Sequence, residues 1–377
     1  MQRALLLAGA GSGWIPLAHA AALAYAPVVQ GVALKFPRDY GAHPDFRIEW
    51  WYVTGWLDRI EGAPPCGFQV TFFRVRTPLQ AGASRFTATQ LLFAHAAVSD
   101  ARVGHILHEE RAARAGFGLA EASVTDTDVL IRDWRLRREP SGTSASYAAT
   151  IQAREFALRL NLQPSQALLL QGREGYSQKG PAIENASYYY SEPHLQVSGE
   201  LTVRGKRESV RGTAWFDHEW SSAPMPPGAI GWDWLGLNLD DGGALMAFQL
   251  RGSSNELRSS SEPRSPNEPV PAVWSAAKLR RADGTLWQPA RNTLGFAPQR
   301  HWTSPQGGRY PVETRLTLGE RTLHLRPLFD AQELHAQTMG NTYWEGAVTA
   351  HEGEGAGAKR VGRGYWELTG YGKPLRM

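Results

Sequence analysis

Short runs in which apolar and polar residues alternate recur along the chain, and they constrain its fold more than any other feature. Clear examples are residues 67–76, 195–204 and 315–325. Side chains of a β-strand point alternately to opposite faces, so this period of two predicts strands with one buried face. Turn residues such as Pro64-Pro65 and Asp283-Gly284 separate the runs at short intervals. Many short strands with regular turns predict an all-β sandwich or barrel.

The chain is long enough for two domains, and its composition suggests where they divide. Residues 221–228 are rich in Pro and small side chains and form the best candidate boundary. Residues 253–269 are polar and predict an exposed loop within the second domain. No long stretch has a helical period, although we expect short helices at residues 165–170 and 330–334.

The first 22 residues predict an export signal. Arg3 supplies the positive start, residues 4–17 the apolar centre, and Ala18-His19-Ala20 an A-x-A cleavage site. The apolar run is too short for a membrane span. We therefore expect a periplasmic or secreted protein that begins near Ala21, with no stable membrane insertion.

Charge and motifs argue against several functional classes. The net charge of +4 is spread along the chain, and its Arg residues alternate with acids, which is typical of solvated strand faces and not of a nucleic-acid groove. Neither a Gly-x-Ser-x-Gly elbow nor a phosphate-binding loop occurs in the mature sequence. Cys66 is the only cysteine, so no internal disulfide can form. The imidazoles of His105 and His108 would diverge on a strand, and the other histidines are scattered, so we expect no metal site and no cofactor.

Aromatic clusters with an acidic residue point to a site for an apolar ligand. The main clusters are Glu49-Trp50-Trp51-Tyr52 and Trp232-Asp233-Trp234, and a third lies at residues 364–371. A carboxyl group among aromatic rings is poorly solvated, so its pKa should rise, as a general acid requires. Alternation leaves open which members of each cluster face inward.

The stretch Trp215-Phe216-Asp217-His218-Glu219-Trp220 carries the most chemistry. On a strand, His218 and Trp220 share one face, and Asp217 and Glu219 share the other. We favour a site for His218 with Trp220. The two acids either take part in that site or fix the turn into residues 221–228. Tyr188 and Tyr190 also share a face and could line a pocket mouth.

Several segments resemble the AttH-like group of secreted lipocalin-like proteins. They include FPRDYGAHPDFRIEWWYVTGWL, GTAWFDHEWSS, GWDWLGLNLDDGGALMAFQLR, YWEGAV and GRGYWELTGY, and the resemblance spans residues 36–372. This group is related to the carotenoid 1,2-hydratase (hydroxyneurosporene synthase) family and is often labelled predicted secreted hydrolase. The resemblance implies two lipocalin-like antiparallel β-barrels in tandem, at residues 36–222 and 229–377.

The resemblance also implies a chemistry. The hydratase branch protonates an isoprenoid double bond and adds water to the tertiary cation. Its functional residues include a His and a Trp in an Asp-His-x-Trp-like motif, which His218 and Trp220 match. That branch also uses a Tyr and an Asp on the following strand, whereas residues 244–250 contain neither. The acid would then be Asp217 or Asp233, with Glu49 next.

Two functions follow from these features. One is a carrier for a hydrophobic, isoprenoid- or lipid-like molecule in an aromatic-lined cavity, serving an ABC export system as AttH-like proteins are thought to do. The other is a hydratase or lyase acting on such a molecule. The missing acid at residues 244–250 favours the carrier. The residues expected to contact the ligand are Trp50, Trp51, Tyr52, Tyr188, Tyr190, Trp220, Trp232 and Trp234.

Overall fold

The structure is a computed structural model that describes residues 24–59, 62–80, 82, 84–141, 144–223, 225–252, 272–336, 340–353 and 355–374. The expected export signal and the polar stretch at residues 253–269 lie outside the described residues. Within them, the regular elements are β-strands and three short 3-10 helices, η1 (Arg38–Tyr40), η2 (Arg291–Thr293) and η3 (Gly355–Gly357). The all-β prediction is therefore confirmed. No helix in the described ranges is long and apolar enough to cross a membrane.

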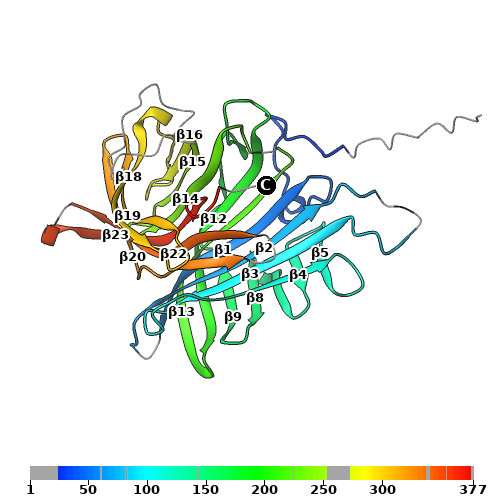
Figure 1. Cartoon of the computed structure of the whole chain (residues 1–377), viewed down its shortest axis with the longest axis horizontal. Coiled ribbons are helices and arrows are strands. Elements are labelled where there is room, and N and C mark those ends of the chain that lie inside the picture. The colour runs from blue at the N-terminus through cyan, green and yellow to red at the C-terminus, as the bar shows by residue number, and fades with distance from the viewer. Residues whose placement is uncertain are drawn as a thin grey trace, which may run out of the picture.

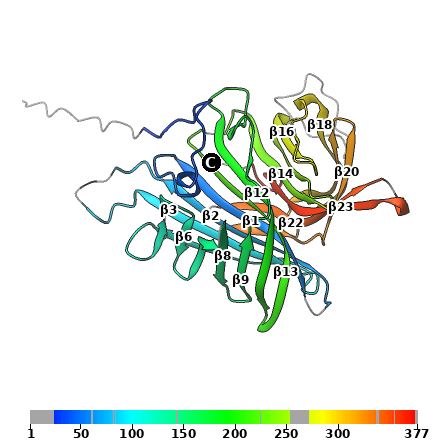
Figure 2. The same ribbon diagram turned by 180° about the vertical axis from the view of Figure 1, so that it is seen from behind.

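The first sheet contains the first thirteen strands of the described chain. They are β1 (Ile48–Arg59), β2 (Cys66–Arg76), β3 (Gln90–Ser99), β4 (Leu107–Arg114), β5 (Ala120–Ala122), β6 (Asp128–Ile131), β7 (Trp134–Ser141), β8 (Ser144–Gln152), β9 (Phe156–Gln163), β10 (Leu169–Leu170), β11 (Tyr176–Gln178), β12 (Ala186–Val203) and β13 (Lys206–Ser221). The order is β4-β3-β2-β1-β13-β12-β9-β8-β7-β6-β5, and β10 and β11 pair with β12. Because β6 comes against β3 and β4 across the seam, the sheet curls into a nearly closed antiparallel barrel (Figures 1 and 2).

The interior of this barrel follows from the alternation in the sequence. Every second residue of a strand points inward, so Trp51 and Val53 of β1 meet Phe68 and Val70 of β2. Phe216 of β13 joins them, and all five side chains have no exposed surface. Burial of large apolar side chains stabilises the barrel by about 1.5–3 kcal/mol for each.

The second sheet is a curled half-barrel. Its strands are β14 (Ala229–Leu239), β15 (Ala244–Gly252), β16 (Ala272–Arg280), β17 (Leu286–Trp287), β18 (Leu294–Thr303), β19 (Arg309–Leu318), β20 (Arg321–Pro327), β21 (Glu333–Ala336), β22 (Asn341–Glu352) and β23 (Lys359–Thr369). The order is β17-β16-β15-β14-β23-β22-β20-β19-β18, with β21 paired to β22. The edge strands β17 and β18 do not pair with each other in this order, so the sheet stays open.

The two sheets pack face to face. Strand β1 lies against β23 and β2 against β22, where the blue and orange-red strands cross in Figure 1. Trp56 Nε1 donates a hydrogen bond of 3.0 Å to the Gly364 carbonyl across this interface. Gly67 is required there, because a Cβ at this position would collide with the Tyr365 phenol and the Ala347 methyl group. One end of the interface is thus tightly closed.

The predictions of short helices at residues 165–170 and 330–334 are wrong. Within residues 165–170, Leu169 and Leu170 form β10 and pair with β12. Residues 330–332 are irregular, and β21 begins at Glu333 and pairs with β22. Very short helices are unstable in isolation, whereas pairing with an adjacent strand provides hydrogen-bond partners for the backbone N–H and C=O groups. Pairing with a neighbouring strand therefore decided both conformations.

Candidate functional site

Alternation along β1 and β13 divides the predicted site residues between two faces. In the strand register, Trp51 lies opposite His218 and Tyr52 lies opposite Asp217. The interior of the first barrel receives Glu49, Trp51, Tyr188, Tyr190, His218 and Trp220. The face toward the second sheet receives Trp50, Tyr52 and Asp217, and Trp232 and Trp234 of β14 pack against this face from the second sheet. The structure therefore divides the predicted site residues into two groups on opposite faces of the first sheet. Asp233 belongs to neither group.

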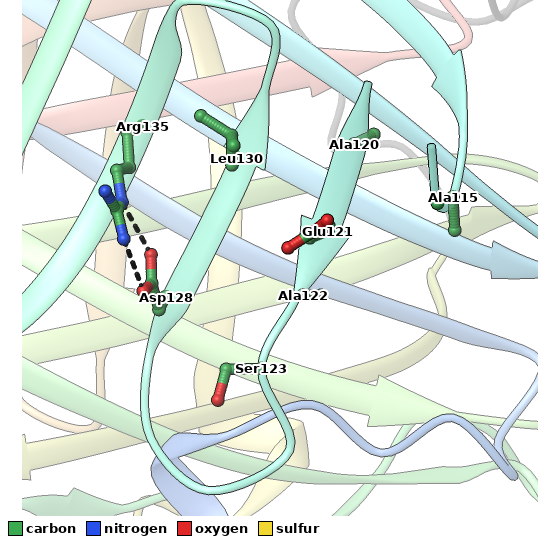
Figure 3. Close-up of a pocket in the computed structure, with 9 residues that line it drawn as sticks. Ala115, Ala120, Glu121, Ala122, Ser123, Asp128, Leu130 and Arg135 are labelled. Atoms are coloured by element: carbon green, nitrogen blue, oxygen red, sulfur yellow. Dashed lines mark hydrogen bonds and ion pairs between the residues drawn. The ribbon is translucent and has the colours of Figure 1, made fainter. Parts of the chain in front are cut away.

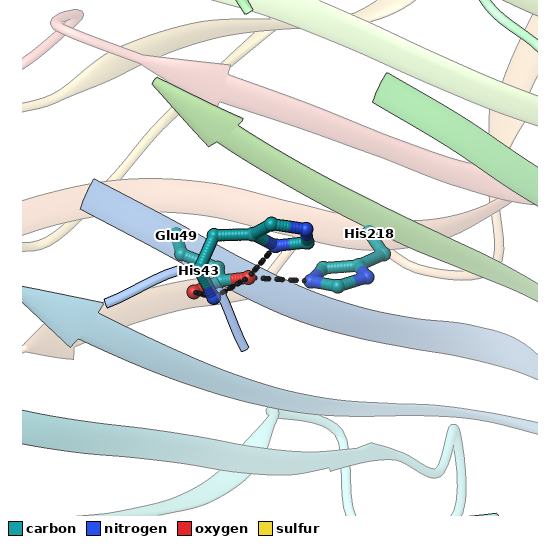
Figure 4. A group of neighbouring side chains, drawn as sticks. All are labelled: His43, Glu49 and His218. Carbon is teal, nitrogen blue, oxygen red and sulfur yellow. Dashed lines mark hydrogen bonds and ion pairs between the residues drawn. The ribbon is translucent and has the colours of Figure 1, made fainter. Parts of the chain in front are cut away.

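The interior group is organised around the Glu49 carboxylate. His43 Nδ1 lies 2.7 Å and His218 Nε2 lies 2.8 Å from the same oxygen, Glu49 Oε1. The Arg74 guanidinium donates to the second oxygen at 2.8 Å, as does the His43 backbone N–H. Figure 4 shows both imidazoles converging on the carboxylate, with His43 reaching in from the loop before β1. We call His43, Glu49, Arg74 and His218 the barrel cluster.

The protonation states of the barrel cluster follow from its contacts. Burial would raise the pKa of Glu49, but hydrogen bonds from His218 and His43 and the charge of Arg74 hold it well below its ordinary value. Burial lowers the pKa of His218 to about 4, so this imidazole is neutral at pH 7. Burial also opposes the charge of His43, but hydrogen bonds to Asp39 and Glu49 raise its pKa. Glu49 is therefore ionised and cannot serve as the general acid.

Aromatic rings fill the space around His218. Trp51 stacks on it with ring centres 4.8 Å apart, and the Tyr190 hydroxyl lies 3.1 Å from His218 Nδ1. Trp220 stacks on His43 at 3.7 Å with an angle of 6° between the rings. Both nitrogens of His218 are engaged and its side chain has no exposed surface. The catalytic role of His218 and Trp220 stays a prediction.

Tyr188 also faces the barrel interior, where it anchors the N-terminal segment. Its hydroxyl accepts a hydrogen bond from the Val29 N–H at 2.9 Å and donates one to the Val29 carbonyl at 3.0 Å. The Tyr188 ring packs against Trp220 and Phe46. Tyr188 therefore fixes the N-terminal segment around Val29 to the first barrel.

The second group lies between the sheets. The Tyr52 and Trp234 rings meet edge to face at 5.1 Å, although they come from different sheets. Trp234 Nε1 donates to the Tyr189 hydroxyl at 3.1 Å, and that hydroxyl donates to Asp217 at 2.8 Å. Trp50 and Trp232 are only partly buried and pack on the same apolar cluster. We call Trp50, Tyr52, Tyr189, Trp232 and Trp234 the inter-sheet cluster.

Asp217 holds the inter-sheet cluster in place through hydrogen bonds to its carboxyl group. Its carboxyl group accepts hydrogen bonds from the Ser191 hydroxyl at 2.5 Å and from Trp215 Nε1 at 2.7 Å, besides the one from Tyr189. Burial raises the pKa of Asp217 to about 7, although these three donors oppose the rise. Since both oxygens are occupied, Asp217 fixes the positions of Tyr189 and Trp215.

Two further carboxyl groups lie beside the inter-sheet cluster; Glu367 belongs to the aromatic cluster predicted at residues 364–371, whereas Glu345 was not predicted. Glu345 of β22 and Glu367 of β23 are direct cross-strand partners. Burial, reinforced by the nearby Glu367, raises the pKa of Glu345 well above its ordinary value. Burial also raises the pKa of Glu367 to about 7. At least one of the pair therefore carries a proton at neutral pH, because adjacent buried carboxylates cannot both ionise cheaply.

The Tyr52 hydroxyl interacts with the Glu345 side chain and opposes the rise in the pKa of Glu345. Glu345 is 1% exposed, and neither its Oε1 atom nor the Tyr52 hydroxyl has a hydrogen bond of normal geometry. Buried polar atoms without partners are rare and often mark functional positions. The repeated Trp-Glu of YWEGAV and GRGYWELTGY was the sequence signal that could have identified both acids.

Polar residues border the same region at Glu219. Its carboxylate accepts a hydrogen bond of 2.5 Å from Ser187 and lies 3.0 Å from Lys179 Nζ. The Lys179 ammonium sits 4.4 Å from the Phe248 ring centre and 4.6 Å from that of Tyr189. The lining of a cavity of about 360 Å³ includes Tyr176, Met246, Trp274 and Lys278. Met246 and Trp274 belong to the same apolar cluster as Trp234, although none of the predicted site residues lines this cavity.

Asp233 takes a different position. It lies on the other face of β14, where Arg251 Nε donates to it at 2.9 Å and Gln249 at 2.7 Å. The Tyr371 hydroxyl adds a third donor at 3.2 Å. Burial raises the pKa of Asp233, but the charge of Arg251 opposes the rise. The structure thus places this predicted acid in an ion pair, apart from the other candidates.

A second cavity, of about 390 Å³, lies on the outer strands β5 and β6 (Figure 3). Its most prominent feature is a bidentate ion pair in which Arg135 donates to Asp128 at 2.7 and 2.6 Å. None of the predicted site residues lines it.

Comparisons with known proteins identify the family. The AttH-like family model matches residues 27–371. A crystal structure of a candidate AttH protein from Nitrosomonas europaea is similar at 47% identity and a TM-score of 0.80, covering 92% of this chain and 99% of that one. Kievitone hydratase from Nectria haematococca shares the fold, with 14% identity, a TM-score of 0.65 and coverage of 93% and 96%. No curated protein matches the chain. The chain belongs to the AttH-like family.

Proposed function

We propose that this protein binds a hydrophobic, isoprenoid- or lipid-like molecule between its two sheets. The observation that carries the proposal is the inter-sheet cluster, in which indole and phenol rings from both sheets converge. Trp50 and Trp232 are only partly buried, so part of this aromatic surface is open to a ligand. The adjoining cavity of about 360 Å³ falls within the range of small-molecule sites and is bordered by Met246 and Trp274.

The cellular setting is part of the same proposal. The leader-like first 22 residues support a periplasmic or secreted location. Membership of the AttH-like family supports a role beside an ABC export system, in which the protein would hold an apolar cargo after export. Such a carrier needs an apolar surface and no catalytic group.

Binding is tested directly by fluorescence titration. A squalene-like or acyclic carotenoid probe should quench the tryptophan emission of the wild-type protein with saturation, and Trp234→Leu should weaken binding about tenfold or more. Trp287→Leu is the matched control, because Trp287 lies on the edge strand β17 outside the inter-sheet cluster. Equal affinity in both variants would contradict the proposed position of the ligand.

A second candidate function is hydration of the bound molecule, and the Glu345–Glu367 pair favours it. The protonated carboxyl would transfer its proton to one carbon of a double bond, which leaves a tertiary cation on the other carbon. Water then adds to the cation and releases a proton to the carboxylate, so the net change is addition of one water molecule. Indole faces of Trp232 and Trp234 would stabilise the cation by about 0.5–2 kcal/mol each. A hydratase activity is also named for the fold neighbour kievitone hydratase.

Isotope labelling separates the two functions. Protein is incubated with the same probes in oxygen-18 water, and the product is analysed by mass spectrometry. A hydratase incorporates label, and Glu345→Gln should abolish incorporation while leaving probe affinity within about twofold. Exposed Glu320→Gln serves as the control. Saturable binding without label in the wild-type protein supports the carrier alone.

A further inference from the structure

We propose that His43, Glu49 and His218 form a binding site for a divalent ion of the first transition row, with Zn²⁺ as the reference ion. The three ligand atoms would be His43 Nδ1, Glu49 Oε1 and His218 Nε2, which all lie within 4.8 Å of one another. They face the interior of the first barrel, on the opposite side of β1 and β13 from the inter-sheet cluster. The proposal is therefore independent of the proposed function.

The donor atoms are already close to the required geometry. Both imidazole nitrogens point at one carboxylate oxygen, at 2.7 and 2.8 Å (Figure 4). Zinc holds nitrogen and oxygen ligands at about 2.0–2.2 Å, which at tetrahedral angles places neighbouring ligand atoms about 3.3 Å apart. Each imidazole nitrogen would have to move about half an ångström away from Glu49 Oε1, and the two nitrogens already lie within 4.8 Å of each other. Two imidazoles and a carboxylate suit Zn²⁺ or Fe²⁺ better than Mg²⁺ or Ca²⁺.

Each ligand is also held by a separate outer partner. His43 Nε2 lies 3.2 Å from Asp39 Oδ1, and His218 Nδ1 lies 3.1 Å from the Tyr190 hydroxyl. Glu49 Oε2, the oxygen not offered to the ion, is taken by Arg74. Metal-binding histidines almost always have such a partner on the second ring nitrogen, because it fixes the ring and its tautomer. An ion would displace the His43 Nδ1 proton to solvent, and the proton of neutral His218 would move to Nδ1, where the Tyr190 hydroxyl accepts it. Both imidazoles would then be neutral, and all three outer contacts would remain in place.

The surrounding charge predicts a fourth ligand. With neutral imidazoles, the two charges of the ion and that of Arg74 exceed the charges of Glu49 and Asp39 by one. A buried excess charge is costly, so the fourth ligand should be an anion such as hydroxide or a carboxylate. An ion could reach the site through the loop before β1, since the Asp39 side chain is 15% exposed and that of His43 is 7% exposed.

The first test of the proposed metal site measures zinc binding by the wild-type, full-length protein. Protein is stripped with EDTA, equilibrated with Zn²⁺, freed of excess ion, and assayed by elemental mass spectrometry and zinc X-ray absorption. We expect one zinc ion per chain with two imidazole ligands and oxygen at about 2.0–2.1 Å. Loss of the ion on removal of excess Zn²⁺, or a first shell without imidazole, would overturn the proposal.

Variants then locate the ion. His43→Gln should lower zinc affinity at least about 10–100-fold, and Co²⁺ loading should lose its visible absorption bands. His95→Gln is the matched control, because His95 is 3% exposed and hydrogen-bonds Tyr343 outside the barrel cluster. Zinc binding by a folded His43→Gln protein at wild-type strength would refute the site. If that variant does not fold, the absorption spectrum of the wild-type protein still decides.

Discussion

Replacing Glu367 by glutamine should change how stability depends on pH. Burial raises the pKa of this carboxyl group from 4.5 to about 7 in the folded protein. The folded state then binds the proton more tightly than the unfolded state does. Its contribution to stability is fully present below pH 4.5 and is lost as the pH rises through 7. Glu367→Gln removes this dependence, because an amide does not titrate.

The size of the effect follows from that pKa difference. A difference of one corresponds to about 1.4 kcal/mol, so the ceiling is about 3 kcal/mol. The side chain is partly exposed, and solvent screening reduces the expected value to about 1–2 kcal/mol.

Urea unfolding at pH 5 and pH 8 measures this quantity. Between these values, the wild-type protein should lose about 1–2 kcal/mol of unfolding free energy relative to Glu367→Gln. The exposed Glu320→Gln variant should follow the wild-type curve. If wild type and Glu367→Gln lose stability in parallel, the carboxyl group does not have a raised pKa and the acid-pair reasoning fails.

Three further predictions concern ion pairs and hydrogen bonds of buried side chains. Arg74→Met leaves the buried Glu49 carboxylate without its guanidinium partner, so chemical unfolding should show a loss of about 3–5 kcal/mol. Tyr189→Phe removes the hydroxyl that links Asp217 to Trp234 and should cost about 1–3 kcal/mol in the same assay. Hydrogen bonds from Arg102 and Arg59 lower the pKa of Glu208 to about 2, so stability should fall as the pH drops from 4.5 to 2; circular dichroism of Glu208→Gln should show a weaker acid transition.

Local patterns in the sequence were enough to predict the fold class. Alternation and turn residues predict antiparallel strands wherever one face is buried, as along β9. The open edge of the second sheet depends on which distant strands pair, and no local pattern contains that information. The two expected helices were wrong for the same reason, since pairing with β12 and β22 outweighed local preference.

The candidate site was predicted only in part. Alternation correctly placed Asp217 and His218 on opposite faces of one strand, but it could not show that His218 faces the barrel interior and Asp217 faces the second sheet. His43 was not recognised, because it lies on the loop before β1 and turns back onto Glu49 through a local contact that strand alternation does not predict. Glu345 and Glu367 become a pair through the register of β22 and β23, which is set by the whole second sheet.

We propose that an apolar ligand occupies the space between the sheets and not the interior of the first barrel. Photo-crosslinking with a diazirine-bearing isoprenoid or fatty-acid analogue, followed by peptide mass spectrometry, tests it most directly. Labels are expected on Trp50, Trp232, Trp234 and Met246, and an excess of unlabelled analogue should prevent this labelling. Competable labels confined to Trp51, Tyr188 and Trp220 would contradict it.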